Sequence, residues 1–161
     1  MKEKIEFITR SCEETMELAE SFAGMMAGGD LIALIGELGA GKTVFVKGLA
    51  KGLGVDGYNY VNSPSFVAVK EYDGKVPLYH FDVYRFCGRL FNETIDYERY
   101  FYAQGVTAVE WADNISDILP DEYIEVTICY GKDDERIVSF RAVGERPENI
   151  IEKFISARRS A

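Results

Sequence analysis

Residues 36–43 read Gly-Glu-Leu-Gly-Ala-Gly-Lys-Thr, which is the spacing of a nucleotide phosphate-binding loop. The apolar run 31–35 before them is typical of a buried strand, and residues 43–53 favour a helix that ends before Gly54. Glycines in such a loop let consecutive backbone N–H groups converge on an anion, and the helix N-terminus adds partial positive charge. The stretch therefore predicts a phosphate site in an α/β fold of the P-loop NTPase type.

Two side chains of this loop have defined tasks in such sites. The lysine reaches the β- and γ-phosphates, and the hydroxyl that follows it ligates Mg²⁺. These positions are Lys42 and Thr43 here. The sequence thus predicts a nucleoside triphosphate and Mg²⁺ as cofactors, with contacts to Glu37, Leu38, Gly39, Ala40, Gly41, Lys42 and Thr43.

The composition indicates a globular protein and argues against several functions. The 161 residues carry 27 acidic and 18 basic side chains, a formal charge of −9, so a nucleic-acid backbone would repel the chain. A basic protein partner is easier to accommodate. No apolar run is long enough for a membrane span, the N-terminal residues lack a secretory core, and three scattered cysteines and one histidine disfavour a zinc site. We expect a single cytoplasmic domain over residues 1–161.

The rest of the chain predicts a mixed β-sheet with flanking helices. A capping box at Ser11 opens a helix to about Ala27, and Pro147 lies in the first turn of a C-terminal helix. Strand-like runs occur at 66–72 and 76–84, at 106–109, at 123–130 and at 136–143, and residues 93–101 have weak helical character. The turn pair Asp73-Gly74 joins the first two runs and indicates an antiparallel hairpin.

Two carboxylates follow apolar strands and are candidates for chemistry. Asp82 ends one strand and Glu110 ends another. In open α/β sheets the ligand lies beyond the carboxyl ends of the strands, so both acids can face Mg²⁺ or the attacking water. Carboxylates at strand ends also commonly cap turns, and position alone leaves both readings open. His80, between apolar strand residues, favours a structural, hydrogen-bonded role.

A third element lies between the phosphate loop and the hairpin. The segment Ser63-Pro64-Ser65-Phe66 either forms an ordinary proline turn or acts as a switch loop whose hydroxyls reach the γ-phosphate. For the base, we expect the segment from Ser11 to Thr15 and the turn from Lys132 to Asp134 to flank the adenine, with Ser11 and Asp134 as candidate contacts.

Together these motifs resemble the TsaE (YjeE) family of small bacterial ATPases, which are required for threonylcarbamoyl modification of tRNA adenosine beside the anticodon. The resemblance covers nearly the whole chain. It is carried by the loop at 36–43, by Asn-Ser-Pro-Ser-Phe at 62–66, by Tyr-His-Phe-Asp-Val-Tyr-Arg at 79–85 and by Val-Glu-Trp at 109–111. The resemblance implies that the nucleotide is ATP.

The resemblance implies roles for individual residues. Thr43 and Glu110 would help to hold Mg²⁺, and Asp82 would be the second acid needed for hydrolysis, also near the metal. Trp111 would lie close to the nucleotide. Ser65 would belong to a switch segment that usually carries threonine at this position, and its hydroxyl makes it a candidate catalytic residue.

The resemblance also implies partners. Family members work with two related proteins, TsaB and TsaD, and would use ATP hydrolysis to reset that pair between turnovers, with tRNA held by the partners. Residues 86–92, Phe-Cys-Gly-Arg-Leu-Phe-Asn, depart from the acidic, leucine-containing helix that is common in the family.

Three other functions remain as alternatives. A small-molecule kinase would need an arginine-rich lid, but no arginine lies between Arg99 and Arg136. A regulatory GTPase would need an Asn-Lys-x-Asp segment for guanine, and the sequence has none. A nucleotide-dependent assembly factor with incidental hydrolysis is compatible with all the motifs.

Overall fold

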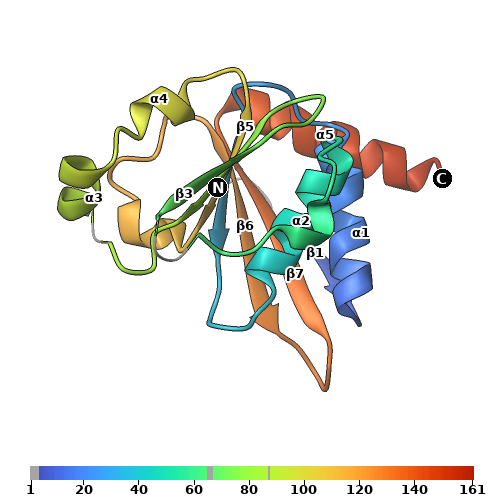
Figure 1. Ribbon diagram of the computed structural model, residues 1–161. Coiled ribbons are helices and arrows are strands. Elements are labelled where there is room, and N and C mark those ends of the chain that lie inside the picture. Colours follow the sequence, from blue (N-terminus) through green and yellow to red (C-terminus); the bar gives the residue numbers. More distant parts are fainter. Residues whose placement is uncertain (1–3, 65–66, 87) are drawn as a thin grey trace.

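The computed structural model describes residues 4–64, 67–86 and 88–161, which build a seven-stranded mixed sheet (Figure 1). The strand order is β1-β7-β6-β2-β5-β4-β3. Strands β6, β2, β5 and β4 are parallel, while β7 pairs antiparallel with β6 and β1, and β3 pairs antiparallel with β4. The bounds are Ile5–Thr9 (β1), Leu31–Ile35 (β2), Val69–Tyr72 (β3), Leu78–Asp82 (β4), Val106–Glu110 (β5), Tyr123–Tyr130 (β6) and Arg136–Val143 (β7).

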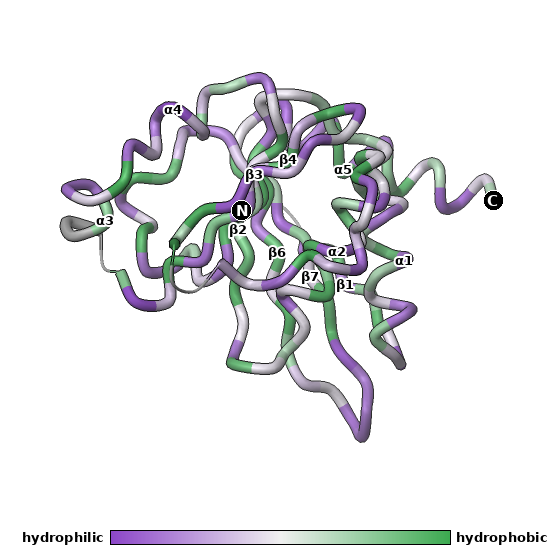
Figure 2. Tube along the Cα trace, in the orientation of Figure 1, coloured by the Kyte–Doolittle hydropathy of each residue, from purple (hydrophilic) through white to green (hydrophobic). Residues whose placement is uncertain are grey.

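Helices cover both faces of the sheet and create two apolar cores (Figures 1 and 2). On one side lie α1 (Cys12–Ala23), α2 (Lys42–Gly52) and α5 (Glu145–Arg159). On the other lie α3 (Gly88–Thr94), α4 (Glu98–Phe101) and the 3₁₀ turn η2 (Ala112–Ile115). A second 3₁₀ turn, η1 (Tyr58–Tyr60), follows α2. The fold is therefore the P-loop NTPase-like α/β arrangement that the sequence predicts.

The central strand explains why its sequence is continuously apolar. Ile32 and Leu34 face the core beneath α1, α2 and α5, and Leu31 and Ala33 face the opposite core, so successive side chains are buried on both sides. Helix α2 packs so closely on α1 that a Cβ added to Gly48 would lie 2.3 Å from the Met16 carbonyl oxygen. The loop of residues 36–41 connects the end of β2 to the N-terminus of α2.

Most predicted elements are confirmed, but several details differ from the prediction. Strand β1 was missed, although Ile5, Phe7 and Thr9 alternate in the way that an edge strand requires. Helix α1 ends at Ala23 instead of Ala27. Strand β3 begins only at Val69, because the chain before it turns at Ala68, whose φ is 66°. Residues 93–101 are helical only at their two ends, in α3 and α4.

The base of the sheet is tied to α5 by an ion pair whose loss should lower stability. The buried Asp30 carboxylate accepts from Arg146 Nε at 2.6 Å, from Arg146 Nη2 at 2.9 Å and from the Ala27 N–H at 2.7 Å. We expect Asp30→Ala to lower the free energy of unfolding by about 2 kcal/mol, measured by urea denaturation. The control Glu125→Ala, which removes a more exposed partner of Arg141, should cost below about 1 kcal/mol. Equal losses for both variants would contradict this ranking.

Among the described residues, no helix is both long and apolar enough to cross a membrane.

Candidate functional site

The phosphate loop lies between β2 and α2, at the carboxyl edge of the parallel strands. Its backbone turns through left-handed conformations at Gly39, with φ of 78°, and at Gly41, with φ of 113°. A Cβ added to Gly41 would meet no described heavy atom within 4 Å, beyond its own chain neighbours. Glycine here therefore keeps open the space into which a phosphate group would fit.

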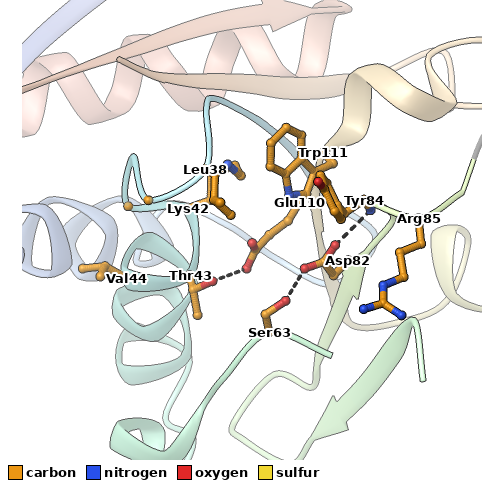
Figure 3. A pocket seen from close by; sticks show the side chains of 12 residues that line it. Leu38, Lys42, Thr43, Val44, Ser63, Asp82, Tyr84, Arg85, Glu110 and Trp111 are labelled. Atoms are coloured by element: carbon orange, nitrogen blue, oxygen red, sulfur yellow. Dashed lines mark hydrogen bonds between the residues drawn. The ribbon is translucent and has the colours of Figure 1, made fainter. Parts of the chain in front are cut away.

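The two candidate carboxylates converge on this loop (Figure 3). Asp82 and Glu110 are register partners at the ends of the parallel strands β4 and β5. Both side chains are almost fully buried, and Glu110 Oε1 accepts a 2.8 Å hydrogen bond from the Thr43 hydroxyl. The strand pairing, which cannot be read from either motif alone, therefore brings three predicted metal-site residues together.

His80 supports Glu110 from within the sheet. Its side chain has no exposed area, and Nε2 lies 2.7 Å from Glu110 Oε1. An ionised carboxylate only accepts hydrogen bonds, so the geometry assigns the tautomer with the proton on Nε2. Among the described residues no group pairs with Nδ1. His80 thus has the hydrogen-bonded role that the sequence favoured.

Asp82 is held in a fixed direction by two donors. Oδ1 accepts from the Tyr84 backbone N–H at 2.9 Å, and Oδ2 accepts a short hydrogen bond from the Ser63 hydroxyl (Figure 3). The segment expected to act as a switch therefore contacts the candidate catalytic acid through Ser63. Ser65, the residue predicted to be catalytic, lies outside the described residues.

Lys42 is buried at the base of the site. Its Nζ donates to the carbonyl oxygens of Gly36 at 2.6 Å and Glu37 at 2.8 Å, and it lies 4.0 Å from the centre of the Trp111 ring. Burial lowers the pKa of Lys42, and the charges of Glu110, Asp82 and Asp113 partly oppose that change. Trp111 itself has φ of 62° and packs on Tyr84, with ring centres 4.9 Å apart. Trp111 therefore borders the site, as the resemblance implied.

These side chains line one cavity of about 420 Å³, which is within the usual range for a small-molecule site. It contains Leu38, Gly39, Gly41, Lys42, Thr43, Asp82, Glu110 and Trp111 from the predicted set. The sequence interpretation missed Val44 and Tyr84. Arg85 also lines the cavity, and its closeness to Asp82 in the sequence was the only signal for it. Tyr84 and Arg85 lie two and three residues after Asp82, and Val44 follows Thr43, so nearness to the motifs was the available signal.

A second hollow of about 380 Å³ shares Gly39, Gly41 and Val44 with the first. Ser11 and Asp134, the candidate adenine contacts, both line it, together with the buried Ala40. The Ser11 hydroxyl also caps α1 by accepting from the Glu14 N–H at 3.0 Å. The structure thus brings the two predicted base-flanking segments to one side of the phosphate loop. Glu37 instead lines a separate hollow beyond Trp111, and its carbonyl oxygen faces Lys42.

The oxygen donors fit Mg²⁺. Hydroxyl and carboxylate oxygens are its preferred protein ligands, and adjacent ligands at about 2.1 Å from the metal lie about 3.0 Å apart. The 2.8 Å separation of Thr43 Oγ1 and Glu110 Oε1 is close to that value. Among the described residues no cluster of three His, Cys, Asp or Glu side chains could hold a metal ion. A site of few protein ligands is what Mg²⁺ uses beside phosphates, with water and phosphate oxygens completing the shell.

A glycine-rich loop between β2 and α2, facing acids on neighbouring parallel strands, defines the chain as a P-loop NTPase-like α/β protein. Comparison with known proteins is more specific. A family model described as threonylcarbamoyl adenosine biosynthesis protein TsaE matches residues 9–138. The chain belongs to the TsaE family.

Several relatives carry the name tRNA threonylcarbamoyladenosine biosynthesis protein TsaE. The protein of Bacillus subtilis is 44% identical over 152 residues, which is 94% of each chain. The protein of Treponema pallidum is 32% identical over 132 residues, covering 82% of this chain and 96% of the relative. The crystal structure of Bacillus subtilis YdiB superposes with a TM-score of 0.82 at 39% identity, over 100% of this chain and 99% of that one. These matches confirm the resemblance that the motifs indicated.

Proposed function

We propose that this protein is a Mg²⁺-dependent ATPase that supports threonylcarbamoyl modification of tRNA adenosine by binding a TsaB–TsaD-type complex and resetting it through ATP hydrolysis. The observation that carries the proposal is the convergence of Thr43, Glu110 and Asp82 on the cavity beside Lys42. Membership of the TsaE family supports the pathway, because the relatives are named for threonylcarbamoyladenosine biosynthesis.

The chemistry follows from charge and position. Bound Mg²⁺ would neutralise charge on the phosphate oxygens, and Thr43 and Glu110 would hold it, with Asp82 alongside. Lys42 would leave the carbonyl oxygens of Gly36 and Glu37 to contact the β- and γ-phosphates. Asp82, oriented by Ser63 and the Tyr84 N–H, is placed to orient the attacking water. Gly39 to Thr43 would supply the backbone donors.

The acidic composition fits partners that hold the tRNA. With a formal charge of −9, the chain gains little from direct contact with a phosphate backbone. We propose that Ser11 and Asp134, which line the second hollow, contact the base of ATP. We further propose that the protein acts in the cytoplasm.

Partner stimulation is the test of the reset function. Arg85 lines the cavity, but it is exposed to solvent. An exposed guanidinium is a weak source of positive charge for the transferred phosphoryl group, so we expect the isolated protein to lack full stabilisation of that group. We expect slow steady-state hydrolysis by the isolated protein and an increase of at least about tenfold with TsaB–TsaD, the kind of gain that a completed phosphoryl-transfer site provides. Full turnover without the partners would remove the reset model. The Asp82→Asn variant distinguishes an assembly factor: if it bound ATP, failed to hydrolyse it and still supported modification, hydrolysis would be incidental.

A further inference from the structure

Two side chains of the β6–β7 hairpin form hydrogen bonds to the outer side of the phosphate loop. Tyr130, the last residue of β6, and Arg136, the first of β7, are direct register partners. The Arg136 guanidinium lies 4.5 Å from the centre of the Tyr130 ring. The two residues therefore act as one stacked unit, which we call the hairpin clasp.

The clasp donates to two carbonyl oxygens of the loop. The Tyr130 hydroxyl donates to the Leu38 oxygen at 2.7 Å, and Arg136 Nε donates to the Ala40 oxygen at 3.1 Å. The Tyr130 hydroxyl also lies against Gly39, where an added Cβ would be only 3.0 Å away. The close approach of the Tyr130 hydroxyl thus leaves little room for a side chain at position 39.

Because of peptide geometry, these two hydrogen bonds also orient N–H groups on the other side of the loop. In a trans peptide the C=O of one residue and the N–H of the next point in opposite directions. Fixing the carbonyls of Leu38 and Ala40 toward the hairpin therefore fixes the N–H groups of Gly39 and Gly41 away from it. Both glycines have left-handed backbones and line the cavity. Glycine backbones are conformationally permissive, so these outer contacts narrow the range of directions that the two N–H groups adopt.

Arg136 is itself held in place. Its Nη1 donates to the Glu135 carbonyl oxygen at 3.1 Å and to the Asp134 oxygen at 3.4 Å. The hairpin turn is closed by the Gly131 N–H on the Glu135 oxygen at 2.9 Å. The hairpin turn that carries the clasp is thus stabilised by its own hydrogen bonds. The clasp can therefore hold the phosphate loop in one conformation.

We propose that Tyr130 and Arg136 are positioning residues that preorganise the amide donors of the phosphate loop. Phosphate binding in this protein then depends on a hairpin about ninety residues away in the sequence. The inference rests on the proposed nucleotide binding, and it concerns phosphate affinity alone. Neither side chain belongs to the loop motif or to the pair of carboxylates.

The test compares a nucleotide with a ligand that has no nucleoside. We would measure the binding of ATP and of inorganic tripolyphosphate, each with Mg²⁺, by isothermal titration calorimetry. Tyr130→Phe should weaken both ligands by about fivefold, the size expected for one neutral hydrogen bond. Arg136→Lys keeps the charge but loses the Nε donor, and it should weaken both by a similar factor. Tyr102→Phe, at a residue that is 65% exposed and lines neither hollow beside the phosphate loop, is the matched control and should change neither.

The outcomes separate the possible failures. Unchanged affinity for tripolyphosphate in Tyr130→Phe and Arg136→Lys overturns the clasp, whether or not ATP binding falls. Arg136 also lines the second hollow, so a loss confined to ATP would place its effect at the nucleoside. Thermal unfolding midpoints are measured alongside. A variant with an unchanged midpoint has not been destabilised in general, so its loss of phosphate affinity is then assigned to the loop. If the unaltered protein bound neither ligand, the proposed function would fail first and the clasp with it.

Discussion

Glu110→Gln is expected to lower the rate of ATP hydrolysis by about a hundredfold or more while weakening ATP binding by less than about tenfold, because it removes a preorganised charge from the reacting centre. The carboxylate is 3% exposed and lies within hydrogen-bond distance of Thr43 and His80. Glutamine is nearly isosteric, and its amide oxygen can still accept from both neighbours. Glu110→Ala would leave the buried His80 Nε2 and the half-buried Thr43 hydroxyl without this partner, so loss of stability would obscure its effect on catalysis.

The measurement is single-turnover hydrolysis of radiolabelled ATP with the TsaB–TsaD complex present, together with equilibrium binding. Asp56→Asn makes the same change of charge at an exposed loop residue and should leave both quantities unaltered. A Glu110→Gln variant that hydrolyses ATP at the normal rate would mean that this carboxylate supports the sheet and the Thr43 hydroxyl only.

Lys42→Met is expected to weaken ATP binding by about tenfold to a hundredfold, the effect of losing charge-assisted hydrogen bonds to phosphate oxygens. Methionine keeps an apolar stem near the Trp111 ring, which Lys42 Nζ contacts at 4.0 Å. The ammonium in this structure donates to Gly36 and Glu37, so the exchange of these carbonyl oxygens for phosphate oxygens reduces the net gain and sets an upper limit on the effect.

Isothermal titration with ATP measures this prediction, and a thermal midpoint shows how much stability the loop loses. Lys153→Met, on the exposed side of α5, removes the same charge away from the site and should bind ATP normally. If both lysine variants bound ATP equally well, the phosphate loop would not be the nucleotide site and the proposed function would fall.

Local spacing accounts for the parts of the fold that were predicted from the sequence. The phosphate loop at 36–43 could be predicted because the strand before it, its own glycines and lysine, and the helix after it follow one another directly in the sequence. The strand pair 123–130 and 136–143 was predicted with its observed bounds, because alternation and a short polar turn specify a hairpin. The capped start of α1 at Ser11 was likewise predicted from four neighbouring residues.

The errors had two kinds of cause, contacts with distant residues and a local turn that ends a helix early. Strand β1 exists because Ile5 to Thr9 pair with β7, more than a hundred residues later, and its short alternating pattern was too brief to stand out. Helix α1 stops at Ala23 although apolar Met26 continues the helical pattern, because Gly24 begins a turn and Asp30 binds the Ala27 N–H. Sequence separation hides the cause of the first error, whereas the second has a local cause within a few residues of the helix end.

By itself, the sequence determined the phosphate loop, the family and the identity of the two acids, since each depends on short-range patterns of residue type. Only the tertiary structure decided that Asp82 and Glu110 are register partners facing Thr43, and that Tyr130 and Arg136 hold the loop from outside. The physical reason is that strand order and register follow from packing the whole sheet, and side chains dozens of residues apart become neighbours only through that packing.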